Sequence, residues 1–223
     1  MENDALVYKT AETQGMFPLK KRRKSYTIKM ISIGKEELDM RVIAGKARRL
    51  PLVSPEGRGT RPTTDRIKET LFNILQDDIP GCRFLDLFSG SGAIGIEAIS
   101  RGAKEAVFVE FGKEALSCIR ANLKKTKLES QAVVFPVEVS YAISKLARQQ
   151  ETFDIIYADP PYERGFEPKI LEWLGDAKIM NPDTILILET SLDTPVDYVD
   201  TEQFEIVRIK EYKNNQHVFL RAK

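Results

Sequence analysis

The 223-residue chain is poor in the residues that build metal and disulfide sites. It contains one histidine, His217, and two cysteines, Cys82 and Cys118, which lie 36 positions apart. A single histidine excludes a multi-histidine metal site, and the cysteine spacing matches neither a zinc motif nor a disulfide framework. We therefore expect no bound metal, a strand position for His217 and a buried, inert thiol at Cys118.

Long apolar stretches and targeting patterns are also absent from the sequence. No apolar run reaches the ~18 residues that a membrane span needs, and the first residues show no charged-then-apolar signal pattern. Hydrophobic residues make up 42% of the chain and charged residues 30%, as in soluble globular proteins. The length favours one α/β domain with extensions over two full domains. We expect a cytoplasmic protein that does not contact a membrane.

The net charge of +1 conceals an uneven distribution of charge along the chain. Residues 1–40 carry 8 basic and 6 acidic residues, residues 41–68 carry 8 and 2, and the rest carry 18 and 25. A basic segment on an acidic body favours contact with a polyanion, although a solvated charged surface would have the same composition. The residues that we expect to contact phosphate are Arg41, Lys46, Arg48, Arg49, Arg58, Arg61 and Arg66, with structural ion pairing as the alternative for the last three.

Composition divides the chain into three segments. Residues 1–39 contain a run of five basic residues, 20–24, and no long amphipathic period, so we expect a disordered basic extension. Residues 40–62 are rich in Gly, Pro and Arg, which predicts a basic arm or hairpin. Residues 63–223 are expected to form the main domain. It would open with a helix over about 64–76, because Thr63-Thr64-Asp65 is typical of a helix N-cap.

From residue 83 onward, strand and helix patterns alternate. The expected strands are 83–88, 106–110, 132–137, 153–158 and 184–189, and the expected helices are 93–101, 113–125, 139–149 and 167–176. This alternation predicts an α/β fold with a mostly parallel sheet and helices on both faces. Two further strands, 204–212 and 216–222, are joined by the hairpin signal Lys213-Asn214-Asn215, so the sheet should end on an antiparallel edge.

A glycine-rich turn follows the first of these strands. Gly90, Gly92 and Gly95 form the pattern G-x-G-x-x-G between a strand and a helix. Such glycines permit a tight turn and let the backbone approach a bound ligand closely. Taken alone, the pattern is weak: a plain glycine turn in an α/β fold is one alternative, and a nicotinamide cofactor is the functional rival.

Two carboxylates beside this turn favour a cationic ligand. Asp86, four residues before Gly90, would repel the pyrophosphate of a dinucleotide. It would attract the α-ammonium and sulfonium groups of S-adenosylmethionine by ~1–4 kcal/mol. Glu110, at the end of the next strand, suits the ribose diol of either cofactor. We therefore expect S-adenosylmethionine to bind here through Asp86, Phe88, Ser89, Gly90, Gly92 and Glu110.

A second motif, Asp159-Pro160-Pro161-Tyr162, directly follows the fourth strand and should lie at the same edge of the sheet. Its two prolines stiffen the turn and leave carbonyl groups facing outward. The Asp159 carboxylate and the Pro160 carbonyl would hold the two hydrogens of a planar –NH₂ group, and Tyr162 would stack on its ring for ~1–3 kcal/mol. The motif predicts methyl transfer to an exocyclic base amine, and an ordinary proline-rich turn is the alternative. The expected catalytic residues are Asp159, Pro160, Pro161 and Tyr162.

These motifs resemble a known family. Over residues 40–223 the chain is similar to the bacterial 16S ribosomal RNA guanine-N2 methyltransferases, which are Rossmann-like class I methyltransferases. The resemblance is carried by residues 40–46, 61–66, 86–92 and 159–162. The last motif is shared with amino-methyltransferases that act on adenine, guanine or glutamine. The segment Arg61-Pro62-Thr63-Thr64-Asp65-Arg66 narrows the choice to the ribosomal RNA enzyme.

The resemblance implies a seven-stranded sheet, with residues 63–223 as the catalytic domain. It also implies that the substrate is a guanine of 16S rRNA, in a partly or fully assembled small ribosomal subunit, and we expect the enzyme to act as a monomer. Glu138, in a position where the family more often has Asp, is expected to lie near the cofactor adenine.

Other functions share parts of this pattern. A DNA adenine methyltransferase would use the same chemistry but usually carries a separate target-recognition domain. A protein glutamine methyltransferase would need no basic arm. A non-catalytic ribosome-binding factor would not need the carboxylates Asp86, Glu110 and Asp159.

Overall fold

The computed structural model describes residues 40–55, 64–162 and 164–223. The predicted extension over residues 1–39, and the predicted phosphate contacts of Arg58 and Arg61, lie outside these residues. The boundary predicted between residues 62 and 63 also lies outside them. None of the helices in the described ranges has the length and apolarity to cross a membrane.

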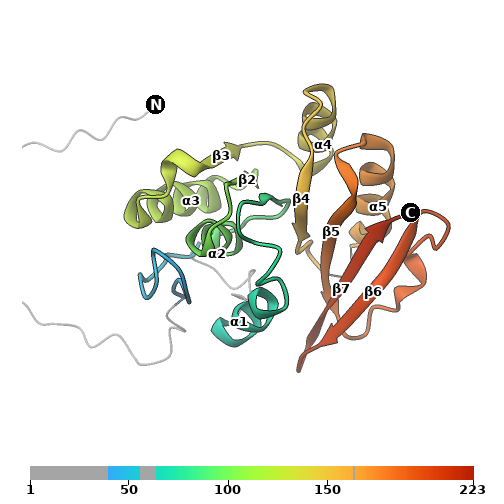
Figure 1. Ribbon diagram of the computed structural model, residues 1–223, viewed down its shortest axis with the longest axis horizontal. Helices are drawn as coiled ribbons and strands as arrows, with labels where there is room; N and C mark the ends of the chain where they lie inside the picture. The colour runs from blue at the N-terminus through green and yellow to red at the C-terminus, as the bar shows by residue number, and fades with distance from the viewer. Residues whose placement is uncertain (1–39, 56–63, 163) are drawn as a thin grey trace, which may run out of the picture. The chain divides into compact units, whose positions relative to one another are not determined.

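The described residues form a seven-stranded sheet in the order β3-β2-β1-β4-β5-β7-β6 (Figure 1). The first five strands along the chain pair in parallel, whereas β7 is antiparallel to both β5 and β6. The strands are β1 (Arg83–Asp86), β2 (Glu105–Val109), β3 (Ala132–Phe135), β4 (Phe153–Ala158), β5 (Met180–Ser191), β6 (Phe204–Glu211) and β7 (Asn215–Ala222). The predicted parallel sheet with an antiparallel C-terminal hairpin is confirmed.

Helices cover both faces of the sheet, because successive residues of each strand point to opposite sides. On β1, Phe84 belongs to one apolar cluster and Leu85 to the other. The first cluster takes in helices α1 (Asp65–Ile74), α2 (Ala93–Arg101) and α3 (Lys113–Thr126), and the second takes in α4 (Val139–Arg148) and α5 (Phe166–Ala177). Two short 3-10 helices complete the elements, η1 (Glu129–Gln131) and η2 (Val196–Tyr198).

Most element boundaries lie within two residues of the prediction, and β5 differs most. It begins at Met180, not at Thr184, because Met180 pairs with Phe153 before the register shifts. The predicted N-cap of α1 is confirmed, since the Thr64 hydroxyl accepts a hydrogen bond from the Ile67 amide at 3.4 Å.

Two predictions about single residues can be checked against burial. His217 lies on β7 as predicted and is fully buried. The prediction of a buried thiol at Cys118 is wrong, because Cys118 lies at the margin of the buried face of α3 and is only half-buried. The buried cysteine is Cys82, and burial raises the pKa of its thiol to about 12.

Residues 40–55 belong to the packed body of the protein. An antiparallel bridge joins Arg41 to Pro51, and the apolar side chains Met40, Val42, Ala47 and Leu52 enter the first core cluster. The segment lies so close to α2 that a Cβ on Gly45 would be 1.8 Å from the carbonyl oxygen of Ser100. Gly45 also has a φ of +79°, so glycine is required there on two grounds.

Buried polar side chains hold this segment against the helices. Glu97 on α2 accepts hydrogen bonds from the amides of Ile43 at 2.7 Å and Ala44 at 2.9 Å. Asn122 on α3 binds both the amide and the carbonyl of Val53, each at 2.8 Å. The segment satisfies part of its backbone internally, with the Val42 amide donating to Leu50 and the Leu52 amide to Met40, and these side chains serve backbone groups that face the helices.

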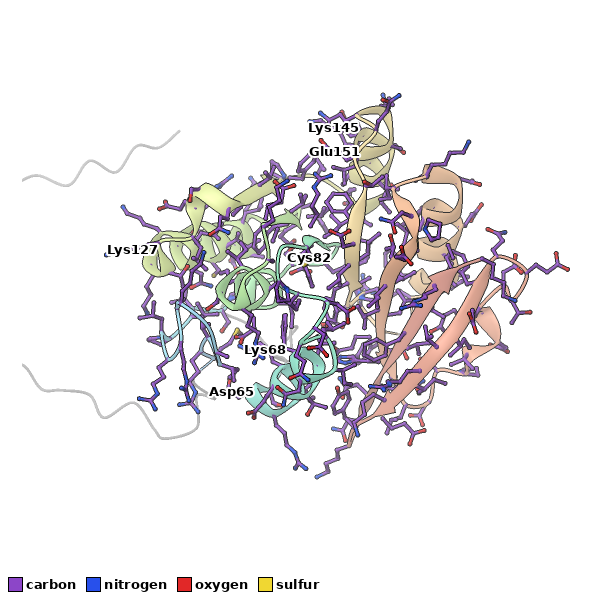
Figure 2. All side chains as sticks on the ribbon, in the orientation of Figure 1. Asp65, Lys68, Cys82, Lys127, Lys145 and Glu151 are labelled. Atoms are coloured by element: carbon purple, nitrogen blue, oxygen red, sulfur yellow. The ribbon has the colours of Figure 1, made fainter. Side chains whose placement is uncertain are left out.

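Glu97 is also the counter-charge of a buried lysine. Lys68 of α1, labelled in Figure 2, is fully buried. Its ammonium donates to the Arg41 carbonyl and lies 4.0 Å from the Glu97 carboxylate. Burial lowers the pKa of Lys68, and the nearby Glu97 opposes this shift in part. A buried cation is tolerated only beside such partners.

We predict that Glu97→Ala will destabilise the protein by about 3–5 kcal/mol, because it leaves Lys68 without its buried counter-charge and two amides without acceptors. Glu172→Ala, at an exposed position of α5, is the matched control and should change the free energy of unfolding by less than about 0.5 kcal/mol. Urea denaturation measures both. Equal stabilities for the two variants would contradict this account of how residues 40–55 are held.

Candidate active site

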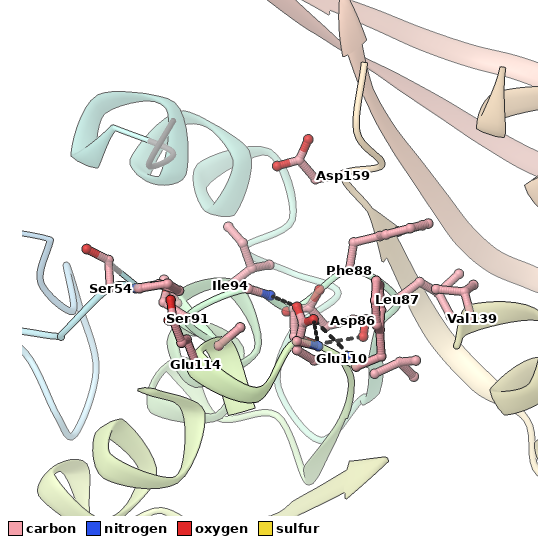
Figure 3. Close-up of a pocket in the computed structure, with 18 of the residues that line it drawn as sticks. Ser54, Asp86, Leu87, Phe88, Ser91, Ile94, Glu110, Glu114, Val139 and Asp159 are labelled. Atoms are coloured by element: carbon pink, nitrogen blue, oxygen red, sulfur yellow. Dashed lines mark hydrogen bonds between the residues drawn. The ribbon is translucent and has the colours of Figure 1, made fainter. Parts of the chain in front are cut away.

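A cavity of about 620 Å³ lies at the carboxyl ends of β1, β2 and β4 (Figure 3). This volume is typical of a small-molecule site. β1 is the point at which the strand order reverses, since the chain continues to β2 on one side and returns to β4 on the other. Such a switch point leaves a crevice between the loops that follow two neighbouring strands.

The glycine turn forms the floor of this cavity. Gly90 and Gly92 have φ values of +50° and +79°, a left-handed conformation in which a side chain would be strained. Gly92 is the N-cap of α2, and Gly95 lies inside the helix. A Cβ on Gly95 would be 2.4 Å from the Phe108 ring, so this third glycine lets α2 approach β2. The turn therefore presents backbone to the cavity and begins a buried helix behind it.

Glu110 ties the glycine turn to the loop after β2. One of its carboxylate oxygens accepts from the Gly90 amide at 2.9 Å. The other accepts from the amides of Phe111 at 2.8 Å and Gly112 at 2.7 Å. A carboxylate offers about four acceptor positions, so one remains for a ligand hydroxyl. The sequence did not predict this bracing contribution.

Asp86 is a buried carboxylate without a hydrogen-bond partner. Its side chain lines the cavity, is 1% exposed, and neither oxygen has a hydrogen bond among the described residues. Burial raises the pKa of Asp86 to about 7. The Gly95 amide lies near enough to oppose this shift without making a hydrogen bond of normal geometry, and the charge of Glu110 increases it. An orphaned buried acid is costly unless a ligand completes it. The site therefore fits a cationic donor such as the ammonium group of S-adenosylmethionine.

The Asp159–Tyr162 loop lies at the same cavity. Asp159 and Pro161 line it, Pro160 is buried beside them, and Tyr162 is 38% exposed. Burial, followed by the charges of Glu189 and Asp86, raises the pKa of Asp159 well above its ordinary value. The cavity thus has one acid beside the glycine turn and another on the opposite loop.

Glu189, near the end of β5, was missed in the sequence. It is 4% exposed, and its carboxylate accepts hydrogen bonds from four side chains, Tyr157, Tyr162, Asn215 and His217. A signal was present in the sequence, because Glu189 follows an apolar run, as Asp86 and Glu110 do. The bond from Tyr162 connects this buried group to the Asp159–Tyr162 loop.

The structure brings most of the predicted site residues together. Those that line the one cavity are Asp86, Phe88, Ser89, Gly90, Glu110, Asp159 and Pro161. Glu138 does not line it: its side chain is exposed at the N-cap of α4, while its neighbours Val137 and Val139 line the wall. The wall also includes residues that were not predicted, namely Met40, Ser54, Pro55 and Phe111. The roles of all these residues stay predictions.

The basic residues that were predicted to contact phosphate differ in whether their side chains already have a partner in the protein. Arg41 pairs with Asp65 at 2.8 Å, and the Lys46 ammonium donates to Gln131. Arg48, Arg49 and Arg66 are exposed and make no ion pair with a described residue. Within the described residues of the predicted set, these three side chains are therefore available to a polyanion.

Comparison with known proteins gives a consistent result. The model of the family described as "Conserved hypothetical protein 95" matches residues 40–221. The chain is 35% identical to "Ribosomal RNA small subunit methyltransferase D" of Haemophilus influenzae, over 71% of this chain and 82% of that protein. It is also 35% identical to the protein of the same name from Escherichia coli K12, over 69% and 76% of the two chains.

The fold has solved counterparts as well. The structure titled "Putative methyltransferase yhhF from Escherichia coli" superposes with a TM-score of 0.71 at 28% identity, covering 83% of this chain and 98% of that one. The Rossmann-like methyltransferase fold predicted from the sequence, and the resemblance on which it rested, are confirmed.

We predict that S-adenosylmethionine will bind about tenfold more weakly at pH 6 than at pH 8. With a pKa of about 7, Asp86 would be about one-tenth ionised at the lower pH and nine-tenths at the higher, and the cation prefers the ionised form. Ligand binding should therefore lower this pKa and release a proton.

Calorimetric titration at several pH values measures this effect. Asp86→Asn should bind weakly with a much flatter pH dependence, which separates the titration of Asp86 from that of the ligand. Glu114→Gln, at an exposed carboxylate that also lines the cavity, should retain the parent profile. A parent-like profile in Asp86→Asn would mean that another group titrates.

Proposed function

Because the chain belongs to the Conserved hypothetical protein 95 family, we propose that it transfers a methyl group from S-adenosylmethionine to the N2 amine of a guanine in 16S rRNA. The observation that carries the proposal is the shared cavity, which has an orphaned acid at one loop and the Asp159–Tyr162 motif at the other. The substrate would be the small ribosomal subunit, partly or fully assembled, and the enzyme would act as a monomer.

The glycine turn and the residues around it would hold the cofactor. Asp86 would accept from the ammonium group, and the remaining acceptor position of Glu110 would bind a ribose hydroxyl. Phe88, Ser89 and Gly90 would line the same wall, with Gly92 supporting the turn from behind. The cofactor supplies a sulfonium methyl group, which is an electrophile.

The Asp159–Tyr162 loop would hold the acceptor amine. The lone pair of an exocyclic amine is delocalised into the ring, so the nitrogen is a weak nucleophile until its hydrogens are fixed. Asp159 and the Pro160 carbonyl would accept those two hydrogens and orient the lone pair, with Pro161 stiffening the turn. A raised pKa brings Asp159 closer to the range of a proton acceptor, so it would also take the proton that the methylated nitrogen loses.

Tyr162 would provide a stacking surface for the target base. Its ring is partly exposed, while its hydroxyl is engaged with Glu189 at 3.1 Å. A base lifted out of an RNA helix would lie on this ring for ~1–3 kcal/mol. The motif by itself does not discriminate guanine from adenine or glutamine. Support for small-subunit ribosomal RNA comes from the names of the similar proteins. The choice of guanine rests on the family resemblance, to which the Arg61–Arg66 segment contributes.

We predict that Asp159→Ala will retain S-adenosylmethionine affinity within about threefold while methyl transfer falls by ~10²–10³. The reason is that Asp159 acts mainly when positive charge forms on the nitrogen. Cofactor titration and single-turnover transfer to 16S rRNA from a deletion strain measure the two effects. Asp176→Ala, an exposed carboxylate on α5, should match the parent in both.

Mass spectrometry of the nucleosides identifies the product of the same reaction. N2-methylguanosine should be missing from 16S rRNA of the deletion strain and return with the parent gene. Loss of N6-methyladenine from DNA would instead favour the adenine rival, and loss of methylglutamine the protein rival. If Asp159→Ala transfers methyl at the parent rate, the proposed amine chemistry is wrong.

The exposed arginines should set RNA affinity without affecting the cofactor. We predict that replacing Arg48 and Arg49 by Ala will weaken RNA binding and flatten its dependence on salt, by about one to two units of log–log slope, because fewer counterions are released. The matched control is Lys145→Ala with Arg148→Ala, which removes the same charge from α4. Filter binding over a salt series gives the slopes. Equal slopes for the two double variants would mean that Arg48 and Arg49 do not contact phosphate.

A further inference from the structure

The carboxylate of Glu189 is the centre of a buried hydrogen-bond network. One oxygen accepts from the Tyr157 hydroxyl and from His217 Nε2 at 3.0 Å. The other accepts from the Tyr162 hydroxyl at 3.1 Å and from the Asn215 amide. Four donors saturate the acceptor positions of a carboxylate, so Glu189 has a complete set of partners with no solvent among them.

These donors keep Glu189 charged inside the protein. Burial alone would raise the pKa of Glu189, but the bonds from His217, Tyr157 and Asn215 outweigh that effect and lower it below its ordinary value. Both ring nitrogens of His217 are engaged, with Nε2 3.0 Å from Glu189 and Nδ1 3.1 Å from the Tyr212 hydroxyl. The groups that face Glu189 therefore come from the β4 strand and its loop, and from the C-terminal hairpin.

Three of the four donors are explained by packing alone. Tyr157, Asn215 and His217 are buried polar side chains on β4 and β7, and each needs a partner in the interior. Tyr162 is different, because it is 38% exposed on a loop and water could satisfy its hydroxyl. Core packing does not require this bond. The bond fixes the ring of Tyr162, which belongs to the Asp159–Tyr162 motif.

We infer that Glu189 is a positioning residue for the methyl-transfer site, which anchors Tyr162 through its hydroxyl and is itself set in place by Asn215 and His217 of the C-terminal hairpin. The inference rests on the proposed function for its catalytic consequence. A ring tethered at its hydroxyl keeps one orientation beside the cavity-lining Asp159 and Pro161, so the target base meets a preformed surface and loses less freedom on binding. No described residue of the antiparallel hairpin lines the cavity. The hairpin would influence methyl transfer only through Glu189 and Tyr162.

A double-mutant cycle tests this coupling directly. Tyr162→Phe keeps the ring and removes the tether. Glu189→Gln nearly preserves shape but leaves one accepting oxygen for four donors, so the three buried donors displace Tyr162 and the tether is lost. Each should lower the single-turnover rate at saturating RNA by about tenfold and leave S-adenosylmethionine affinity unchanged. Since both remove the same tether, the double variant should be no slower than Glu189→Gln within about twofold. If the double variant instead lost about a hundredfold in rate, which is the product of the two separate losses, the inference would be overturned.

A control variant and a substrate-free measurement complete the test. Tyr212→Phe removes a hydroxyl from the outer end of the same network, so it should cost stability without changing the methyl-transfer rate.

NMR of ring-labelled tyrosine identifies the Tyr162 signal by its loss in Tyr162→Phe. That signal should shift in Glu189→Gln and stay in place in Tyr212→Phe. An unchanged Tyr162 signal in Glu189→Gln would overturn the anchoring. This measurement needs no RNA, so it tests the anchoring of Tyr162 separately from the proposed function. If the parent protein failed to methylate 16S rRNA, that result would refute the proposed function and not the anchoring.

Discussion

The parallel pairing of β1 with β4 is the constraint on which the site depends. Asp86, the last residue of β1, lies opposite Tyr157 of β4, so the loops that follow the two strands begin side by side. Residues far apart in the sequence meet at one edge because both strands run in the same direction. The cofactor half and the acceptor half of the proposed reaction therefore share one cavity without any dedicated connection between them.

The carboxylates around the cavity differ in their hydrogen-bond partners and in the direction of their pKa shifts. Asp86 has no hydrogen-bond partner and a pKa of about 7, so a cationic ligand would complete it. Glu110 braces two loops through backbone amides. Glu189 has four donors and stays charged, and its charge helps to raise the pKa of Asp159. Environment, not residue type, separates the ligand-binding, bracing, anchoring and proton-accepting roles that we assign to these acids.

Residues 40–55 connect the cavity with the basic surface. Met40, Ser54 and Pro55 line the cavity, while Arg48 and Arg49 of the same segment face solvent. Glu97 and Asn122 fix the segment to α2 and α3, so neither face can move without breaking buried hydrogen bonds. A cofactor wall and a surface for RNA built from one short segment would place the target nucleotide at a defined distance from the methyl donor.

The sequence by itself determined the order of the elements and the two motifs. Strand and helix periodicity, Gly90, Gly92 and the Asp159–Tyr162 turn are local features, and they predicted the parallel sheet and the edge at which its loops meet. The resemblance, not the local pattern, placed Glu138 near the cofactor adenine, and that role stays a prediction; the structure shows its side chain exposed at the N-cap of α4, between the cavity-lining Val137 and Val139. Tertiary structure alone decided that Glu97 would hold residues 40–55 and that Glu189 would anchor Tyr162. Hydrogen-bond partners of a buried charge come from distant segments, and only the folded packing determines which of them are within reach.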